Sequence, residues 1–155
     1  MPLHPAWIKN ISRRVLWAAL EKDITKDERL EMYEYFDGLC AYCGEELHNR
    51  WHADHILSVD RGGFNHISNR VPSCPRCNEQ EKQEREWLEF LKSKCGSDLV
   101  VLNKRTMKIT NWNNRHSPSA APVTDAQRDA WKKEVTDLAS AIDDAWNRLK
   151  SLKNG

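Results

Sequence analysis

Apolar residues recur at helical spacing near the start of the chain and predict a helix over residues 5–22. Pro5 stands at its first position, where a helix needs no backbone N–H. A second helix is expected over residues 26–36, because Thr25 and Glu28 form a capping-box pattern. Asp37 and Gly38 are expected to end it. The apolar positions of the first helix are Trp7, Ile8, Ile11, Val15, Leu16, Ala19 and Leu20.

The helical pattern is lost over residues 39–77, where four of the five cysteines lie. Short extended pieces are expected at residues 51–57 and 70–73, with a turn at residues 60–63 between them. A third helix is predicted over residues 78–92. Residues 97–123 show the least regular pattern, and residues 117–122 have the composition of a linker.

The clearest helix is predicted over residues 124–155, where Thr124 and Gln127 form a second capping pattern. Its apolar residues follow one another at steps of four and three, which is the pattern of a heptad seam. The seam either packs on the chain's own body or pairs with a second copy, giving a homodimer through the C-terminal helix. The seam residues are Trp131, Val135, Leu138, Ile142, Ala145, Leu149 and Leu152.

The overall charge gives no general attraction to nucleic acid, because 24 Lys and Arg balance 23 Asp and Glu in 155 residues. Positive charge is local: residues 103–116 contain Lys104, Arg105, Lys108 and Arg115 and no acid, which indicates either a solvated segment or a phosphate contact. No apolar run is long enough to span a bilayer, and the N-terminus has no apolar signal segment. We therefore expect a cytoplasmic protein with no membrane partner.

Two Cys-x-x-Cys pairs, Cys40 with Cys43 and Cys74 with Cys77, are separated by 30 residues. Two residues between thiolates let both sulfurs reach one ion, and two such pairs complete a tetrahedron. Because four thiolates leave no position for water, the pattern predicts structural Zn²⁺. The alternative is two reduced or disulfide-bonded pairs without metal.

The segment around and between these pairs carries a set of polar and glycine residues, which are Asp54, His55, Gly62, Gly63, Asn69 and Asn78. In this order and within a four-cysteine frame, residues 39–83 resemble the HNH endonuclease family. The resemblance implies an α+β fold, mostly helical overall, with a small ββα-metal core stapled by zinc and flanked by N- and C-terminal helices. The expected parts are an N-terminal helical extension (1–37), the nuclease core (38–93), an irregular basic segment and linker (94–123) and a C-terminal amphipathic helix (124–155).

The resemblance also implies an activity, the metal-dependent hydrolysis of DNA phosphodiester bonds by nicking or double-strand cleavage. His55 would be the general base, since a histidine with a pKa near neutrality can take a proton from water. Asp54 would hold a divalent ion against the phosphate. Asn69 would orient the loop or the His55 ring. Asn78 stands where the family usually has histidine, so the catalytic ion would have oxygen ligands, which favour Mg²⁺ or Mn²⁺.

Each of these residues also has a simpler interpretation. Asn78 with Glu81 forms a helix-cap pattern, Asn69 fits a turn, and His55 beside Asp54 could be a surface pair. Neighbouring residues on a regular strand face opposite sides, so Asp54 and His55 can share one site only where the strand ends or bends. A non-catalytic zinc-binding module for nucleic acid or protein is therefore the alternative function.

Basic residues around the core are candidate contacts to nucleic-acid phosphates. DNA is the expected partner. RNA is the alternative, because Trp51 and Trp112 could stack on unpaired bases. The candidate phosphate contacts are Arg61, Arg70, Arg76, Lys82, Lys104, Arg105 and Lys108.

Overall fold

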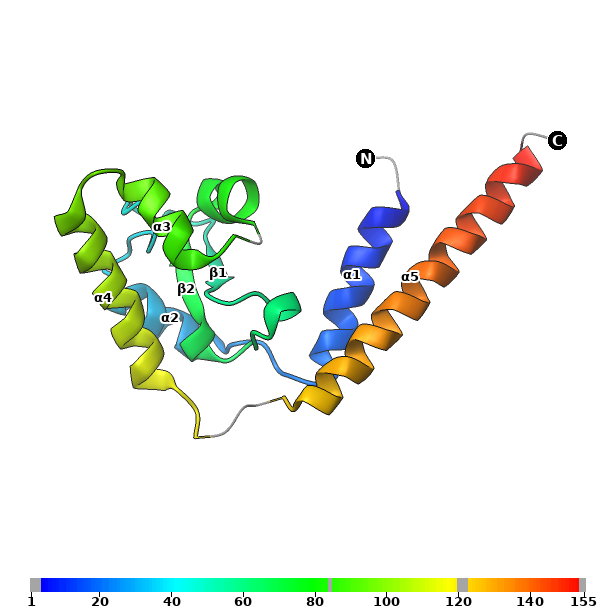
Figure 1. The fold of residues 1–155 in the computed structure, drawn as a ribbon, viewed down its shortest axis with the longest axis horizontal. Helices are drawn as coiled ribbons and strands as arrows, with labels where there is room; N and C mark the ends of the chain where they lie inside the picture. Colours follow the sequence, from blue (N-terminus) through cyan, green and yellow to red (C-terminus); the bar gives the residue numbers. More distant parts are fainter. Residues whose placement is uncertain (1–3, 84, 120–122, 154–155) are drawn as a thin grey trace. The chain divides into compact units, whose positions relative to one another are not determined.

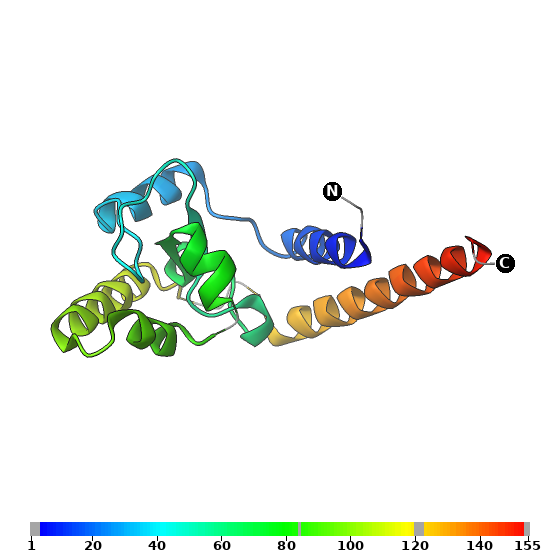
Figure 2. The same ribbon diagram turned by 90° about the horizontal axis from the view of Figure 1, so that it is seen from above.

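The structure is a computed structural model that describes residues 4–83, 85–119 and 123–153. The chain forms two compact units (Figures 1 and 2). The paired-helix unit joins Met1–Lys22 to Val123–Gly155, and the core unit is Asp23–Pro122. The first predicted helix therefore belongs to one unit and the second to the other.

Two helices, α1 (Pro5–Ala18) and α5 (Asp125–Lys153), make up the described part of the paired-helix unit. The predicted cap of α5 is confirmed: the Gln127 backbone N–H donates to Thr124 Oγ1 at 3.2 Å, and the Thr124 N–H donates to Gln127 Oε1 at 2.9 Å. The start of α1 at Pro5 is also confirmed, and the His4 ring accepts from the Ala6 N–H there.

The heptad seam of α5 packs on α1 over part of its length. The rings of Trp17 and Trp131 meet edge to face with centroids 4.8 Å apart, and Trp131 is 5% exposed. Lys9 pairs with Asp143 at 2.9 Å, so the two helices run antiparallel. The end of the seam is open, since Leu152 is 78% exposed. Packing on the chain's own body is thus confirmed for the first part of the seam, and the homodimer stays a prediction.

The core unit is built around a two-stranded antiparallel sheet. Strands β1 (His52–His55) and β2 (Arg70–Ser73) pair with His55 opposite Arg70 and Asp54 opposite Val71. Between them the chain makes two short 3-10 turns, η1 (Val59–Arg61) and η2 (Ile67–Asn69). The predicted extended pieces and the intervening turn are confirmed. The small sheet within a mostly helical chain also confirms the predicted α+β class.

Four helical segments surround this sheet, and α3 lies beside α4 (Figure 1). They are α2 (Lys26–Tyr35), the π-helix η3 (Arg76–Lys82), α3 (Trp87–Cys95) and α4 (Leu99–His116). The predicted capping box of α2 is confirmed, because the Glu28 N–H donates to Thr25 Oγ1 and Glu28 Oε2 accepts from the Thr25 N–H. The apolar core of this unit includes Met32, Phe36, Tyr42, Val71, Phe90, Leu91, Ile109 and Trp112.

The prediction of an irregular segment over residues 94–123 was wrong, because α4 occupies most of it. Asp98 caps α4 by accepting a hydrogen bond from the Val101 N–H at 3.0 Å. The fully buried Trp112 anchors its far end, and the indole N–H donates to the Ile67 and Arg70 carbonyls at 3.1 and 2.8 Å. These contacts with distant parts of the chain stabilise a helix whose sequence is rich in Asn and Thr, which have low helix propensity.

The prediction of one helix over residues 78–92 was also wrong, because two helical segments cover that region. The π-helix η3 ends at Lys82, and Gln83 has a φ of 47°. A new helix then begins after Glu86, whose carboxylate accepts from the Leu88 and Glu89 N–H groups at 2.8 and 2.9 Å. Residues 79–86 favour helix throughout, so the break is not visible in their composition.

Candidate functional site

The four predicted cysteine ligands meet at one point in the core unit. The sulfur atoms of Cys40, Cys43, Cys74 and Cys77 all lie within 4.8 Å of one another. Cys43 Sγ and Cys74 Sγ are 3.8 Å apart, which matches the roughly 3.8 Å edge of a tetrahedron with ~2.3 Å zinc–sulfur bonds. The geometry and the ligand chemistry therefore fit a metal ion such as zinc.

The charges of this cluster also fit a cation. Hydrogen bonds from Cys43 and Cys77 lower the pKa of the Cys40 thiol to about 3. Hydrogen bonding and negative charge from Cys40 and Cys43 raise the pKa of Cys77. One thiolate thus opposes ionisation of the next, and a divalent ion removes this opposition by stabilising all four thiolates together.

Arg105 of α4 braces the first cysteine knuckle, residues 40–43. Its guanidinium donates to the carbonyls of Tyr42 and Cys43 at 2.8 and 3.0 Å. Gly44 has a φ of +73°, and a Cβ there would clash with Arg105 Nη2. Arg105 is thus engaged inside the fold, and its predicted role as a phosphate contact receives no support.

Asp54 lies on the face of β1 that turns toward η3, and it is 9% exposed. Its Oδ2 accepts from the Tyr42 hydroxyl at 2.8 Å and pairs with Lys82 Nζ at 3.0 Å. Burial raises the pKa of the Asp54 carboxyl, and the charge of Lys82 opposes this rise. Oδ1 accepts no hydrogen bond from a described residue, and the Asp54 side chain as a whole is 10% exposed.

His55 follows Asp54 on the strand, and its side chain has a separate set of contacts. His55 Nε2 lies 2.9 Å from Asn65 Oδ1, and Nδ1 lies 3.2 Å from Arg70 Nη1. Because Arg70 can only donate, Nδ1 is the acceptor and Nε2–H donates to Asn65. Burial and the charge of Arg70 lower the pKa of His55 to about 3, so the ring is neutral near pH 7.

Asn69 holds the loop that connects the two strands. Its Oδ1 accepts from the Leu57 N–H, and its Nδ2 donates to the Leu57 and Phe64 carbonyls, each at 2.9 Å. Gly63 fits against this amide, where a Cβ would clash with the Leu57 carbonyl oxygen. Of the two predicted functions of Asn69, the structure supports orientation of the loop.

Asn78 lies inside η3 and is partly buried. The alternative that Asn78 caps a helix was wrong, since Pro75 holds the N-cap position. No hydrogen bond to a described residue engages its side chain. In a π-helix the hydrogen bonds span five residues, so Asn78 and Lys82 lie about one turn apart on η3. Among the described residues, no polar contact joins the side chains of Asp54, His55 and Asn78 to one another.

The predicted phosphate contacts differ in exposure. Lys82 is 2% exposed and Arg70 8% exposed, and both are held by internal partners. Arg76 pairs with Glu45, and Lys108 pairs with Asp37. Arg61 and Lys104 are exposed, and neither has an ion-pair partner among the described residues.

The two tryptophans proposed to stack on RNA bases are already in contact with protein groups. Trp112 is fully buried, so its predicted role in stacking was wrong. Trp51 is partly buried, and the Arg29 guanidinium lies 4.2 Å from its ring centroid.

Three contributors to these networks were missed by sequence reasoning: Tyr42, Asn65 and Asp23. Asn65 binds His55, and Asp23 Oδ1 accepts from Arg70 at 3.0 Å. The only available signal was the position of Tyr42 between Cys40 and Cys43, which places its side chain beside a fixed knuckle.

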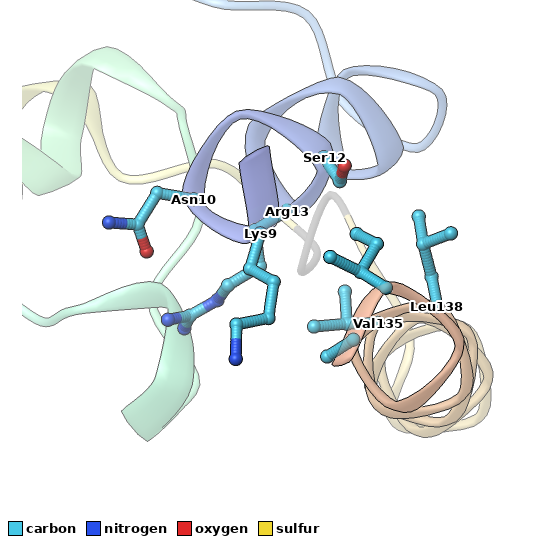
Figure 3. A pocket seen from close by; sticks show the side chains of 8 residues that line it. Lys9, Asn10, Ser12, Arg13, Val135 and Leu138 are labelled. Atoms are coloured by element: carbon cyan, nitrogen blue, oxygen red, sulfur yellow. The ribbon is translucent and has the colours of Figure 1, made fainter. Parts of the chain in front are cut away.

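The paired-helix unit contains a groove of about 200 Å³ between α1 and α5 (Figure 3). Lys9, Asn10, Ser12 and Arg13 line it from α1, and Val135 and Leu138 face them from α5. Lys9 is paired with Asp143, and the Arg13 guanidinium lies 5.6 Å from the Trp131 ring. Lys9 and Arg13 thus serve the packing of the two helices.

A strand pair, four converging cysteines and a helical segment after the second knuckle define a metal-knuckle core of the ββα class. Residues 40–84 match the family model described as HNH endonuclease. The resemblance to HNH endonucleases, and with it a relation to nucleases, is therefore confirmed for this segment.

One curated relative is 30% identical over 105 residues, which is 60% of this chain. It is named "SPbeta prophage-derived putative HNH endonuclease YoqL" and comes from Bacillus subtilis (strain 168). The chain spans about 43% of that relative's length. No solved structure matches the chain. Within the described residues, no helix is long and apolar enough to cross a membrane.

Proposed function

We propose that the core unit hydrolyses DNA phosphodiester bonds, with Mg²⁺ or Mn²⁺ held by Asp54 and Asn78 and with His55 as general base. The observation that carries the proposal is that Asp54, within the HNH-matched segment, is held through Oδ2 alone, so that Oδ1 has no hydrogen-bond donor among the described residues. The Asp54 carboxylate on β1 and the Asn78 amide on η3 would offer oxygen ligands, which suit a hard cation. When bound, the ion would stabilise charge on the phosphorane and on the leaving 3′ oxygen.

His55 supports the proposal through its tautomer. Because Nε2–H donates to Asn65, the lone pair that can take a proton is on Nδ1. Arg70 Nη1 is closer to the Ala53 carbonyl, at 2.8 Å, than to Nδ1, at 3.2 Å. If the attacking water replaces Arg70 as the partner of His55 Nδ1, Arg70 Nη1 can therefore still donate to the Ala53 carbonyl.

The test is nicking of supercoiled plasmid by the zinc-loaded protein with Mg²⁺, Mn²⁺, Zn²⁺ or Ni²⁺ added separately. We expect cleavage with Mg²⁺ or Mn²⁺, and loss of at least 100-fold in His55→Ala, since general acid–base catalysis contributes about 10²–10⁴-fold. His48→Ala is the matched control, because His48 is exposed and lies in the same segment. Highest activity with Zn²⁺ would refute the oxygen-ligand assignment.

The ion at the four cysteines is proposed to be Zn²⁺, with a structural role. The sulfur spacing supports this, and four thiolates fill the tetrahedron. Elemental analysis of protein purified without added metal should give one zinc per chain. The Cys77→Ser variant should lose it.

A non-catalytic zinc module that binds nucleic acid or protein is the second candidate. It is favoured by the contacts that already occupy both His55 nitrogens and Asp54 Oδ2. DNA binding without any metal-dependent nicking during long incubation would select it. Exposed Arg61 and Lys104 are the proposed phosphate contacts, and incubation with single- and double-stranded DNA and RNA identifies the substrate.

A further inference from the structure

We infer that Tyr42, inside the first cysteine knuckle, is the positioning residue that orients the Asp54 carboxylate for the proposed catalytic ion. The inference rests on the proposed function, because it concerns the same carboxylate. Its basis is the 2.8 Å hydrogen bond from the Tyr42 hydroxyl to Asp54 Oδ2, between two residues that are 0% and 9% exposed.

Contacts of the ring, the carbonyl and the preceding backbone hold Tyr42 in place. Its ring packs edge to face on Phe90 with centroids 5.1 Å apart, and its carbonyl accepts from Arg105 at 2.8 Å. The preceding residue, Ala41, donates its backbone N–H to the Pro72 carbonyl at 2.9 Å, which joins the knuckle to β2. Cysteine ligands flank Tyr42 on both sides of this short turn, so a bound zinc would hold the hydroxyl at a constant position.

The second donor to Asp54 cannot replace this hydrogen bond. Lys82 also approaches Oδ2, at 3.0 Å, but an ammonium is a point charge with three rotatable donors that can bind either carboxylate oxygen. The hydroxyl of Tyr42 is directional and selects Oδ2. With Oδ2 held, Oδ1 is the carboxylate oxygen without a hydrogen-bond donor among the described residues, and it is the one that a cation would bind.

Loss of this hydroxyl should weaken metal binding by loss of preorganisation. Loss of a hydrogen bond can also make a carboxylate oxygen a stronger metal ligand. Here the hydrogen bond is to Oδ2 and not to the proposed ligand oxygen Oδ1, so its removal adds little electron density at Oδ1. The loss of orientation should therefore be the larger effect. We expect Tyr42→Phe to weaken Mn²⁺ binding about 3- to 10-fold, the range that one hydrogen bond typically contributes.

The experiment measures Mn²⁺ affinity of the zinc-loaded full chain without substrate, by the electron paramagnetic resonance signal of free Mn²⁺. Tyr35→Phe is the matched control, because it removes a tyrosine hydroxyl that donates only to the Lys108 carbonyl at 3.4 Å. Asp54→Asn identifies the binding that depends on the carboxylate. Zinc content and thermal unfolding confirm that Tyr42→Phe keeps the fold, as expected since its ring and the Lys82–Asp54 pair remain.

The expected result is weaker Mn²⁺ binding in Tyr42→Phe, with wild-type affinity in Tyr35→Phe and full zinc in both. Equal Mn²⁺ affinity in the two phenylalanine variants, or tighter binding in Tyr42→Phe, overturns the inference alone. If Asp54→Asn binds Mn²⁺ as well as wild type does, the proposed metal site fails and the inference fails with it. Mn²⁺ binding through Asp54 without any nicking overturns the nuclease proposal and leaves the role of Tyr42 standing.

Discussion

Lys82 and Asp54 form an ion pair inside the core unit. We expect Lys82→Met, which breaks this pair, to lower the stability of the protein strongly. Their side chains are 2% and 10% exposed, and Nζ lies 3.0 Å from Oδ2. Lys82 also donates to the His55 carbonyl at 2.9 Å, so the ammonium joins the two residues that carry the proposed chemistry. Methionine keeps the length and volume of the lysine stem, and the perturbation is therefore mainly the loss of charge.

The expected cost follows from this burial. At 3.0 Å and an effective dielectric constant of about 20, the attraction is about 5–6 kcal/mol. Removal of the ammonium also removes its desolvation penalty, so the net loss is smaller. Breaking one side of a buried pair typically costs about 3–5 kcal/mol, and we expect a value in that range for Lys82→Met.

Removal of both charges should restore much of the stability. Burial raises the pKa of the Asp54 carboxyl despite the nearby Lys82, which indicates that the pair does not fully offset its own desolvation. The double variant Asp54→Asn, Lys82→Met leaves no uncompensated charge. Its free energy of unfolding should lie within about 1.5 kcal/mol of the wild-type value.

The assay is urea unfolding of the four proteins of this double-mutant cycle at saturating zinc, followed by near-ultraviolet circular dichroism. Lys104→Met, at an exposed position of α4, controls for the substitution itself and should change stability by less than about 0.5 kcal/mol. A loss below about 1 kcal/mol in Lys82→Met would refute the reasoning, and so would a double variant less stable than both single ones.

Three further predictions concern the knuckle, the metal and the paired helices. Gly44→Ala should lose about 1–3 kcal/mol of stability and release zinc more readily than Gly96→Ala, because both glycines have positive φ but only Gly44 lies against Arg105. Zinc chelation should remove hydrogen-exchange protection throughout the core unit, and native protection after chelation would contradict a structural metal. Trp131→Ala should destabilise the paired-helix unit by about 3–5 kcal/mol through the lost contact with Trp17, without change in zinc content.

The features predicted correctly from the sequence are those set by neighbouring residues. The caps formed by Thr25 with Glu28 and by Thr124 with Gln127 are interactions across three residues, so the pattern contains both partners. Each cysteine pair is also a local pattern, because two intervening residues let both sulfurs reach one ion. Only the meeting of the two pairs depends on the rest of the fold.

The features missed are those set by contacts distant in sequence. The helix α4 is anchored by Trp112, whose indole bonds carbonyls more than 40 residues earlier in the chain. The break after η3 depends on Glu86, an acid in a run of other helix-favouring residues. In the candidate site, Asn65 approaches His55 only because Asn69 folds the intervening loop, a contact that no local pattern contains.

The two proposed ions are linked by the backbone that carries their ligands. Tyr42 lies within the first knuckle and bonds Asp54, while Asn78 directly follows Cys77 of the second knuckle and begins the turn that ends at Lys82. Each proposed oxygen ligand is therefore placed by a segment that the thiolate-bound ion would hold. Zinc should bind first and create the weaker Mg²⁺ or Mn²⁺ site. Added Mn²⁺ should not restore the fold of zinc-free protein, because ions that prefer oxygen ligands bind thiolates poorly. Without the folded cysteine knuckles, the oxygen ligands of Mn²⁺ are not in place.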